Sequence, residues 1–121
     1  MTERKKLESQ LDTLTSLIVR KRDRKCIDCG VQVNLTCSHL FHRSKRAVRW
    51  DLKNCNCHCL EHNERHDQHP EFYIKWFIDE YGQREYDILL FKSNQIKRFT
   101  IEELRELKTS HESYLSELNQ G

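Results

Sequence analysis

Two pairs of soft metal ligands share one spacing in this 121-residue chain. Cys26 and Cys29 are separated by two residues in the segment CIDCG, and Cys59 and His62 repeat that spacing in CLEH. This spacing lets both side chains of a pair face one ion across a tight turn, and Gly30 can adopt the backbone geometry that such a turn needs. Together the two pairs predict a closed, tetrahedral, structural zinc site with three thiolates and one imidazole.

Two other cysteines compete for the second half of this site. Cys55 and Cys57 are separated by a single residue, which is a less common arrangement for a pair of ligands to one ion. Cys59 and His62 are favoured because their spacing falls in the preferred range of roughly two to four residues. Cys37, Cys55 and Cys57 are then expected to be small buried residues. A core this small should depend on the ion for folding.

The composition limits where such a protein can work. Charged residues make up 33% of the chain, and no apolar run approaches the roughly 20 residues that a membrane-spanning helix needs. The N-terminal segment MTERKKLESQLD lacks the apolar stretch of a secretion signal. We therefore expect no membrane association and a location in a reducing cytosol. There, the six cysteines are better interpreted as metal ligands than as disulfides.

Basic charge is concentrated around the cysteines. Residues 20–53 carry ten Lys or Arg and three Asp or Glu, whereas residues 54–121 carry eight basic and thirteen acidic residues. A local positive field attracts polyanions, chiefly nucleic acid. For the run RKRDRK at 20–25 a merely solvated surface is an equal alternative. A second basic cluster favours binding of nucleic acid; its members are Arg43, Lys45, Arg46, Arg49 and Lys53.

Helices are predicted at both ends of the chain. An apolar stripe with helical spacing runs through about residues 3–20; it consists of Leu7, Leu11, Leu14 and Ile18. Thr100 and Glu103 form a capping box, and a similar apolar stripe follows them toward the C-terminus. Core packing is the first interpretation of the two stripes, and dimerisation is the second.

Between these ends, the patterns predict two more helices and a short strand. Pro70 suits the first turn of a helix and Gly82 its end, and a further helix is expected over about residues 84–91. The segment VQVNLT at 31–36 alternates apolar and polar residues as a strand does. The sequence thus predicts an α+β fold that is mostly helical.

The segments inside and beside the ligand pairs resemble a known class of enzyme. CSHLFHR lies at 37–43, between the two pairs, and Asn63 directly follows the last ligand. A CxxC pair, a histidine at the end of a strand, an asparagine in the next loop and a second pair opening a helix resemble the HNH, or ββα-metal, nucleases. The segments CSH, VRWDLKNC and CLEHN are more closely similar to phage recombination proteins of the NinG (Rap) family and other zinc-containing phage junction-resolving endonucleases.

The resemblance covers about residues 24–92. With the helices expected at both ends, it implies a zinc-stabilised ββα-metal core over residues 23–94. An N-terminal helix over 1–22, used for packing or dimerisation, and a C-terminal helix over 95–121 would flank this core. The resemblance also implies a location in a bacterial or phage-infected host cytosol.

The resemblance assigns roles to three residues. His39 matches the general base, Asn54 the central asparagine that braces the loop, and Asn63 the helix residue that binds a catalytic cation. Phosphodiester hydrolysis needs a base to deprotonate water and a cation to neutralise charge on the phosphate and on the departing oxygen. An imidazole can serve as base near neutral pH, and an asparagine carbonyl oxygen is an acceptable ligand for Mg²⁺ or Mn²⁺.

One position departs from the HNH pattern. Many of these nucleases place an aspartate directly before the base, as a cation ligand, but this chain has Ser38. A hydroxyl is a poorer ligand, so water, His42 or His66 would have to complete the cation site. Without that role, His42 and His66 are expected to be surface residues.

Two functions from different classes follow. The favoured one is a metal-dependent DNA endonuclease that contains structural zinc and a catalytic Mg²⁺ or Mn²⁺. The resemblance implies branched recombination intermediates, such as Holliday junctions or D-loops, as its substrates. Cutting two strands of a symmetric junction calls for two active sites, so a homodimer is expected. The alternative is a zinc-stabilised nucleic-acid-binding module without catalysis.

Overall fold

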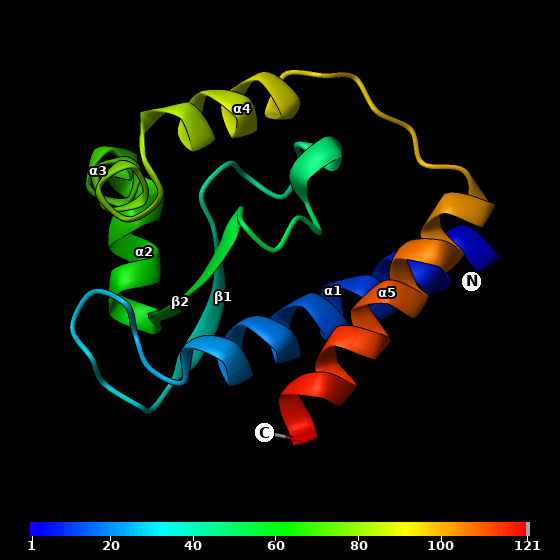
Figure 1. Ribbon diagram of the computed structural model, residues 1–121, viewed down its shortest axis with the longest axis horizontal. Helices are drawn as coiled ribbons and strands as arrows, with labels where there is room; N and C mark the ends of the chain where they lie inside the picture. The colour runs from blue at the N-terminus through cyan, green and yellow to red at the C-terminus, as the bar shows by residue number, and fades with distance from the viewer. Residues whose placement is uncertain (121) are drawn as a thin grey trace.

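A two-stranded antiparallel sheet lies near the centre of the molecule, with helices around it (Figure 1). The computed structural model describes residues 1–120. In chain order the elements are α1 (Glu3–Asp23), β1 (Leu35–His39), the short 3-10 helix η1 (Arg46–Val48), β2 (Cys55–Cys59), α2 (Leu60–Gln68), α3 (Pro70–Tyr81), α4 (Gln83–Ser93) and α5 (Ile101–Gln120). This is the α+β, mostly helical class that the sequence predicts.

The sheet places Cys59, one of the predicted metal ligands, and His39 at opposite ends of the paired strands. Leu35 pairs with Cys59 and His39 pairs with Cys55. β2 is buried along its whole length, because α1 covers one face and α3 contacts the other. On the α1 side Val19 packs with cysteines of β2, and on the other side Tyr73 accepts a hydrogen bond from the Asn56 side chain at 3.0 Å.

The strand begins later than the sequence pattern predicts. Val31 and Val33 are 42% and 67% exposed, and Asn34 has a positive φ of 55°. That left-handed residue ends the loop after the first cysteine pair, so the extended strand starts only at Leu35. The prediction of a strand over 31–36 is therefore wrong for its first four residues.

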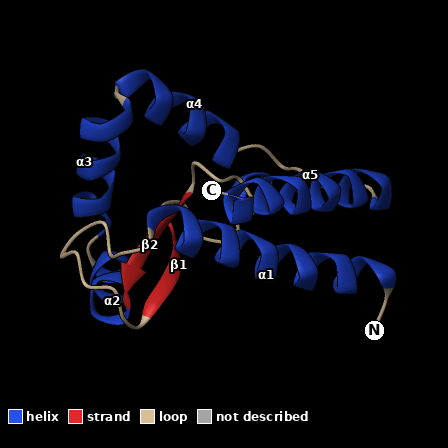
Figure 2. Cartoon of the chain, turned by 60° about the horizontal axis from the view of Figure 1, so that its bottom comes forward, coloured by secondary structure: helices blue, strands red, loops and turns tan. Residues whose placement is uncertain are grey.

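The two terminal helices lie side by side and run in the same direction (Figures 1 and 2). Their apolar stripes are buried against each other and against the loop before β2, in a cluster that contains Leu7, Leu11, Trp50 and Leu104. The predicted capping box is confirmed: the Glu103 N–H donates to the Thr100 hydroxyl and the Thr100 N–H donates to the Glu103 carboxylate, each at 3.0 Å. Both stripes thus serve core packing within one chain.

The third and fourth helices begin and end close to their predicted positions. Pro70 is the first residue of α3, and Gly82, with a positive φ of 93°, separates α3 from α4. Tyr73 and Phe77 are buried, whereas Tyr81 at the end of α3 is 39% exposed. In the part of the chain that the structure describes, no helix is both long and apolar enough to cross a membrane.

Candidate metal centre and adjoining cavity

The four predicted soft ligands come together beside the start of α2. Ligand atoms of Cys26, Cys29, Cys59 and His62 all lie within 4.8 Å of one another. The turn after Cys26 is closed by a hydrogen bond of 2.9 Å from the Gly30 N–H to the Cys26 carbonyl oxygen, and Gly30 has a positive φ of 80°. Cys59 is the N-cap residue of α2, so His62 follows it in the first helical turn.

The distances fit a tetrahedral zinc ion. Zn–S bonds of about 2.3 Å and Zn–N bonds of about 2.0 Å place the ligand atoms roughly 3.5–3.8 Å apart. The Sγ atoms of Cys29 and Cys59 are 3.9 Å apart, and Nδ1 of His62 lies 3.2 Å from Cys59 Sγ and 3.9 Å from Cys26 Sγ. Although burial opposes ionisation, backbone N–H groups around the sulfur lower the pKa of Cys26 and favour its thiolate. This group could therefore hold a zinc ion.

The competing cysteines lie outside this group. Cys55 and Cys57 are fully buried in an apolar cluster with Val19, and Cys37 packs against that cluster. Burial raises the pKa of Cys57 to about 11, which keeps it a thiol. Ligand atoms of Cys37, His39 and Cys55 also lie within 4.8 Å of one another. However, the hydrogen bond with Cys37 and burial raise the pKa of Cys55 well above its usual value, which disfavours the thiolate that a metal needs.

His39 ends β1 with its ring half-buried. Its Nε2–H donates to the Arg49 carbonyl oxygen at 3.0 Å, because a carbonyl can only accept. Burial lowers the pKa of His39, so the ring is neutral at pH 7. With the single proton held at Nε2, the lone pair of Nδ1 is free to accept a proton.

His39 and Asn63 line the same hollow. Two adjoining cavities, of about 630 Å³ and 160 Å³, lie between the end of β1 and α2. Both are lined by His39, His42, Asn63 and Asp67. The structure thus brings the imidazole and the amide to one cavity.

The sequence reasoning missed two carboxylates of α2, Glu64, which lines the larger cavity, and Asp67, which lines both. Asp67 is the one that adjoins Asn63 in both cavities. It stands four residues after Asn63 in α2, so both side chains project from the same helix face. Its carboxylate, together with the neighbouring amide oxygen, is a donor set that suits Mg²⁺ or Mn²⁺. The sequence does carry a signal for Asp67: it lies four residues after Asn63, which directly follows the predicted zinc ligand His62.

The residues expected to compensate for the missing aspartate differ in their surroundings. Ser38 is 3% exposed and lines the smaller cavity. His42 is exposed, and its Nδ1 accepts the Ser44 N–H at 3.1 Å. His66 is 7% exposed, so the expectation of a surface position is wrong for it. The His66 ring also lines the smaller cavity, but its Nε2 lies 2.9 Å from Asp28 Oδ2 and is engaged with that carboxylate.

Asn54 braces the loop between the two strands. Its side chain is fully buried. The amide oxygen accepts the Phe41 N–H at 2.8 Å, and Nδ2 donates to the carbonyl oxygens of Phe41 and Val48 at 2.9 and 3.1 Å. Because it has no exposed surface, Asn54 is a positioning residue that fixes the path of the chain after His39.

The basic cluster is tied to neighbouring helices. Arg49 donates to both carboxylate oxygens of Asp12 in α1, at 3.0 and 2.6 Å, and Arg43 donates to the same carboxylate at 3.1 Å. Burial of Asp12 opposes its ionisation, but hydrogen bonds from Arg49 and Trp50 outweigh that effect and lower the pKa of Asp12. These contacts fasten the loop that follows His39 onto α1.

The remaining members of the cluster are more open to solvent. Arg46 pairs with Glu8, and Lys53 pairs with Glu85, yet the two basic side chains stay 52% and 53% exposed. Lys45 is exposed and forms no ion pair with any described residue. Some members of the cluster thus hold the loop on α1, and others leave exposed cationic groups that a polyanion can reach.

A third cavity carries positive charge up to His39. It has a volume of about 450 Å³ and lies between α1 and β1, where Arg20, Arg43 and Arg49 line it together with His39. In the sequence, Arg20 stands out only as part of the basic run at 20–25. Asp12 lines the same cavity and pairs with Arg43 and Arg49, whereas Arg20 forms no ion pair with a described residue and its guanidinium is suited to hold phosphate oxygens.

Comparisons with known proteins assign the chain to a family. No solved structure and no curated protein sequence gives a significant match to the chain. A family model described as bacteriophage lambda NinG protein matches residues 1–120, which include the metal-ligand group, the cavity residues and both terminal helices. The chain belongs to the NinG family.

Proposed function

We propose that this protein is a metal-dependent DNA endonuclease of the HNH, or ββα-metal, type. Membership in the NinG family implies a role in phage recombination. The observation that supports nuclease activity is the shared cavity, which is lined by the neutral imidazole of His39 and by two oxygen-bearing side chains of α2, Asn63 and Asp67. The order of β1, loop, β2 and α2 also fits the ββα-metal arrangement.

His39 acts as general base in this proposal. The Arg49 carbonyl holds the ring proton at Nε2, so Nδ1 can take the proton from an attacking water molecule. The lowered pKa of His39 keeps the ring in this neutral form at pH 7. Asn54 maintains the geometry by fixing the loop that supplies the Arg49 carbonyl.

Asn63 and Asp67 would hold the catalytic cation, with the Ser38 hydroxyl or water completing the set. Mg²⁺ or Mn²⁺ bound there would supply neutralisation of charge on the phosphate and on the departing oxygen. In this proposal the Asp67 carboxylate supplies the negatively charged cation ligand that Ser38, directly before His39, cannot supply.

The basic residues would hold the DNA backbone beside the cavity. Arg43 lines both the hollow under α1 and the larger cavity with His39, so it can contact the phosphate next to the one that is cut. Arg49 would orient Arg43 through their common partner Asp12, while Lys45, Arg46 and Lys53 would contact DNA electrostatically.

Branched recombination intermediates, such as Holliday junctions or D-loops, are the proposed substrates. Cutting a symmetric junction on two strands calls for a homodimer. The apolar stripes of α1 and α5 are buried against each other, so the dimer interface would use a different surface.

A junction-cleavage assay tests the proposal. The wild-type protein, His39→Ala and the control His69→Ala are incubated with a labelled four-way junction in Mg²⁺ or Mn²⁺. We expect nicking by the wild type and by His69→Ala, whose side chain lies outside the cavities, and a loss of at least about 100-fold for His39→Ala, as removal of a general base costs.

The same assay separates the nuclease from the alternative, a non-catalytic zinc-stabilised binding module. That alternative is favoured by one observation, the serine in place of the usual aspartate before His39. Tight junction binding without nicking in either cation, or equal cleavage by His39→Ala and wild type, would reject the nuclease.

A further inference from the structure

Next to the four-ligand group lies a second cluster of metal-ligating side chains that the proposed nuclease does not use. It consists of Asp28, His58 and His66, and one ligand atom from each lies within 4.8 Å of the other two. The three residues come from different parts of the fold: the loop between Cys26 and Cys29, strand β2 and helix α2. We infer that this cluster is a second zinc site.

The burial of the two histidines leaves one nitrogen of each ring without a partner among the described residues. His58 is 1% exposed and His66 is 7% exposed. Nδ1 of each ring is buried without a hydrogen-bond partner. Buried polar atoms in folded proteins are nearly always paired, so two orphaned ring nitrogens in one cluster indicate that something is bound between these side chains.

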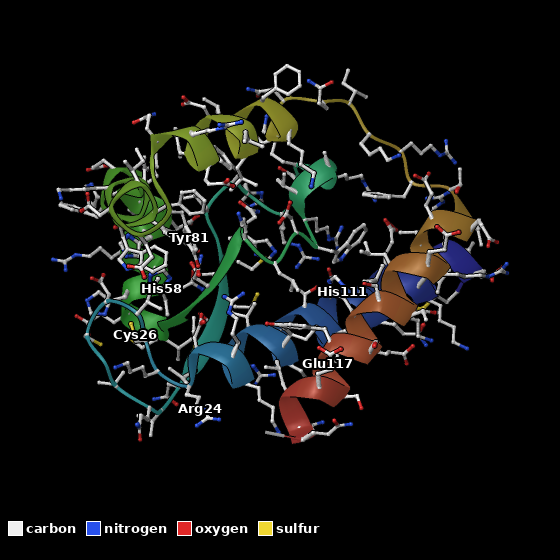
Figure 3. The ribbon with its side chains drawn as sticks, in the orientation of Figure 1. Arg24, Cys26, His58, Tyr81, His111 and Glu117 are labelled. Carbon is white, nitrogen blue, oxygen red and sulfur yellow. The ribbon has the colours of Figure 1, made fainter. Side chains whose placement is uncertain are left out.

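The two imidazole rings lie against each other. Their centroids are 4.5 Å apart and their planes are inclined by 52°. Nε2 of His66 is 2.9 Å from Asp28 Oδ2. An ion between them would give His58 the partner that it lacks and would hold the Asp28 carboxylate against both rings. Figure 3 shows His58 at the same end of the molecule as Cys26, beside α2.

The donor set indicates zinc. Two imidazoles and a carboxylate are a common set of three protein ligands for Zn²⁺, with the fourth position left for water. The Asp28 side chain is 41% exposed, so water and metal can enter from that side. Because the set contains no thiolate, it differs chemically from the neighbouring group of three cysteines and one histidine.

The two sites would take their ligands from the same three segments: the loop after α1, strand β2 and helix α2. Asp28 lies in the loop between two ligands of the first group, and its Oδ2 is 3.8 Å from Nε2 of His62. A second ion would therefore fasten the loop, β2 and α2 together directly beside the first one. The inference does not depend on nuclease activity, although α2 also carries Asn63 and Asp67.

Metal content measures the second site directly. Full-length wild type, His58→Gln and the control His111→Gln are loaded with zinc, freed of excess by gel filtration and analysed by elemental mass spectrometry. His111 is a buried histidine of α5 that is hydrogen-bonded to the Trp50 carbonyl oxygen at 3.0 Å. We expect wild type and His111→Gln to retain one more zinc ion per chain than His58→Gln; equal zinc content in all three proteins would overturn the inference.

Cobalt substitution of the wild type keeps the test valid even if His58→Gln fails to fold. A Co²⁺ ion bound to three cysteines gives intense thiolate charge-transfer bands, whereas one bound to Asp28 and two histidines gives only weaker d–d bands. A titration should show a tightly bound equivalent with charge-transfer bands and another with d–d bands alone. If every tightly bound equivalent produces charge-transfer absorption, Asp28 merely hydrogen-bonds His66 and the second site does not exist.

Discussion

A single backbone carbonyl determines what His39 can do. The Arg49 carbonyl oxygen fixes the proton on Nε2, and Arg49 is itself held by the carboxylate of Asp12 at 2.6 and 3.0 Å. The free Nδ1 therefore depends on an ion pair between α1 and the loop. A substitution of Asp12 would act on His39 through Arg49, without contact between the two side chains.

Asp67 should be essential for cation-dependent cleavage. Asp67→Asn removes the charge of the carboxylate and keeps its shape, so we expect a loss of at least about 10-fold in cleavage rate at low Mg²⁺, with partial recovery at high Mg²⁺, because a neutral amide is the weaker ligand. The measurement is the initial rate of junction cleavage against Mg²⁺ concentration.

Asp79→Asn is the matched control, since Asp79 lies on α3 and, among the described residues, pairs only with Lys75 of the same helix. It should cleave as wild type does at every Mg²⁺ concentration. If Asp67→Asn did the same, Asp67 would have no part in binding the cation.

At the scale of single residues, the grouping of the four candidate metal ligands could be predicted, but their surroundings could not. Cys26 and Cys29 were found because turn geometry fixes the spacing of two ligands to one ion. The contacts of Asp12 with Arg43 and Arg49 join residues more than thirty positions apart, and no local pattern encodes such a pairing. The burial of His66 was missed for the same reason: it depends on Asp28, in a distant loop.

Helix α2 is the element that connects the metal centre with the cavity. Its first turn carries the candidate zinc ligand His62 and then Asn63, and its last turns carry His66 and Asp67. A helix of this length has marginal stability in isolation. The ion held at its N-terminus would therefore set the position of both oxygen ligands in the cavity.

Removing one ligand should unfold this part of the chain. We expect Cys29→Ser to lose zinc from the four-ligand group and to melt at a clearly lower temperature, because binding of structural zinc contributes directly to folding. Zinc content and the melting temperature, measured by circular dichroism, check this.

Cys37→Ser serves as the control because Cys37 lies outside the four-ligand group. Its zinc content should equal that of wild type. An unchanged melting temperature for Cys29→Ser would contradict a structural role for zinc at this group.

The ends of elements were predictable where a residue type fixes the backbone. Pro70 begins α3, Gly82 ends it, and the capping box begins α5, as the sequence indicated. The start of the first strand was not predictable, because alternation of apolar and polar residues, as over 31–36, also occurs in an exposed loop. The left-handed backbone of Asn34 has no reliable sequence signal and moves the strand start to Leu35.

At the scale of the whole molecule, the terminal helices α1 and α5 both contact the loop before β2. Trp50 of that loop packs between Leu11 of α1 and Leu104 of α5, and its indole N–H donates to Asp12 at 2.8 Å. His111 of α5 donates to the Trp50 carbonyl oxygen at 3.0 Å. The first and last helices, which the sequence marked only as apolar stripes, therefore hold the same loop.

His111 should make stability depend on pH. Burial lowers the pKa of His111, whereas hydrogen bonding to Trp50 and the charge of Asp51 oppose this in part. The folded state thus prefers the neutral ring, so this contribution is full above the unfolded pKa of about 6.5 and is lost as the pH falls below it, by at most about 1.4 kcal/mol per pH unit.

The test compares urea unfolding at pH 7.5 and pH 5.5. His111→Gln cannot take up the proton, so its free energy of unfolding should fall less between the two pH values than that of wild type. His69→Gln, whose side chain is exposed, should lose as much as wild type. Equal losses for wild type and His111→Gln would show that His111 does not contribute.

In the loop before β2, two adjacent residues, Arg49 and Trp50, each accept a hydrogen bond from a histidine. The Trp50 carbonyl binds His111 of α5, and the Arg49 carbonyl binds His39. A partner that pulled the last helix outward would release one carbonyl and loosen its neighbour in the chain. Without the Arg49 carbonyl to hold the proton at Nε2, the His39 ring could move its proton to Nδ1. Binding of a partner at α5 would then slow proton transfer to His39.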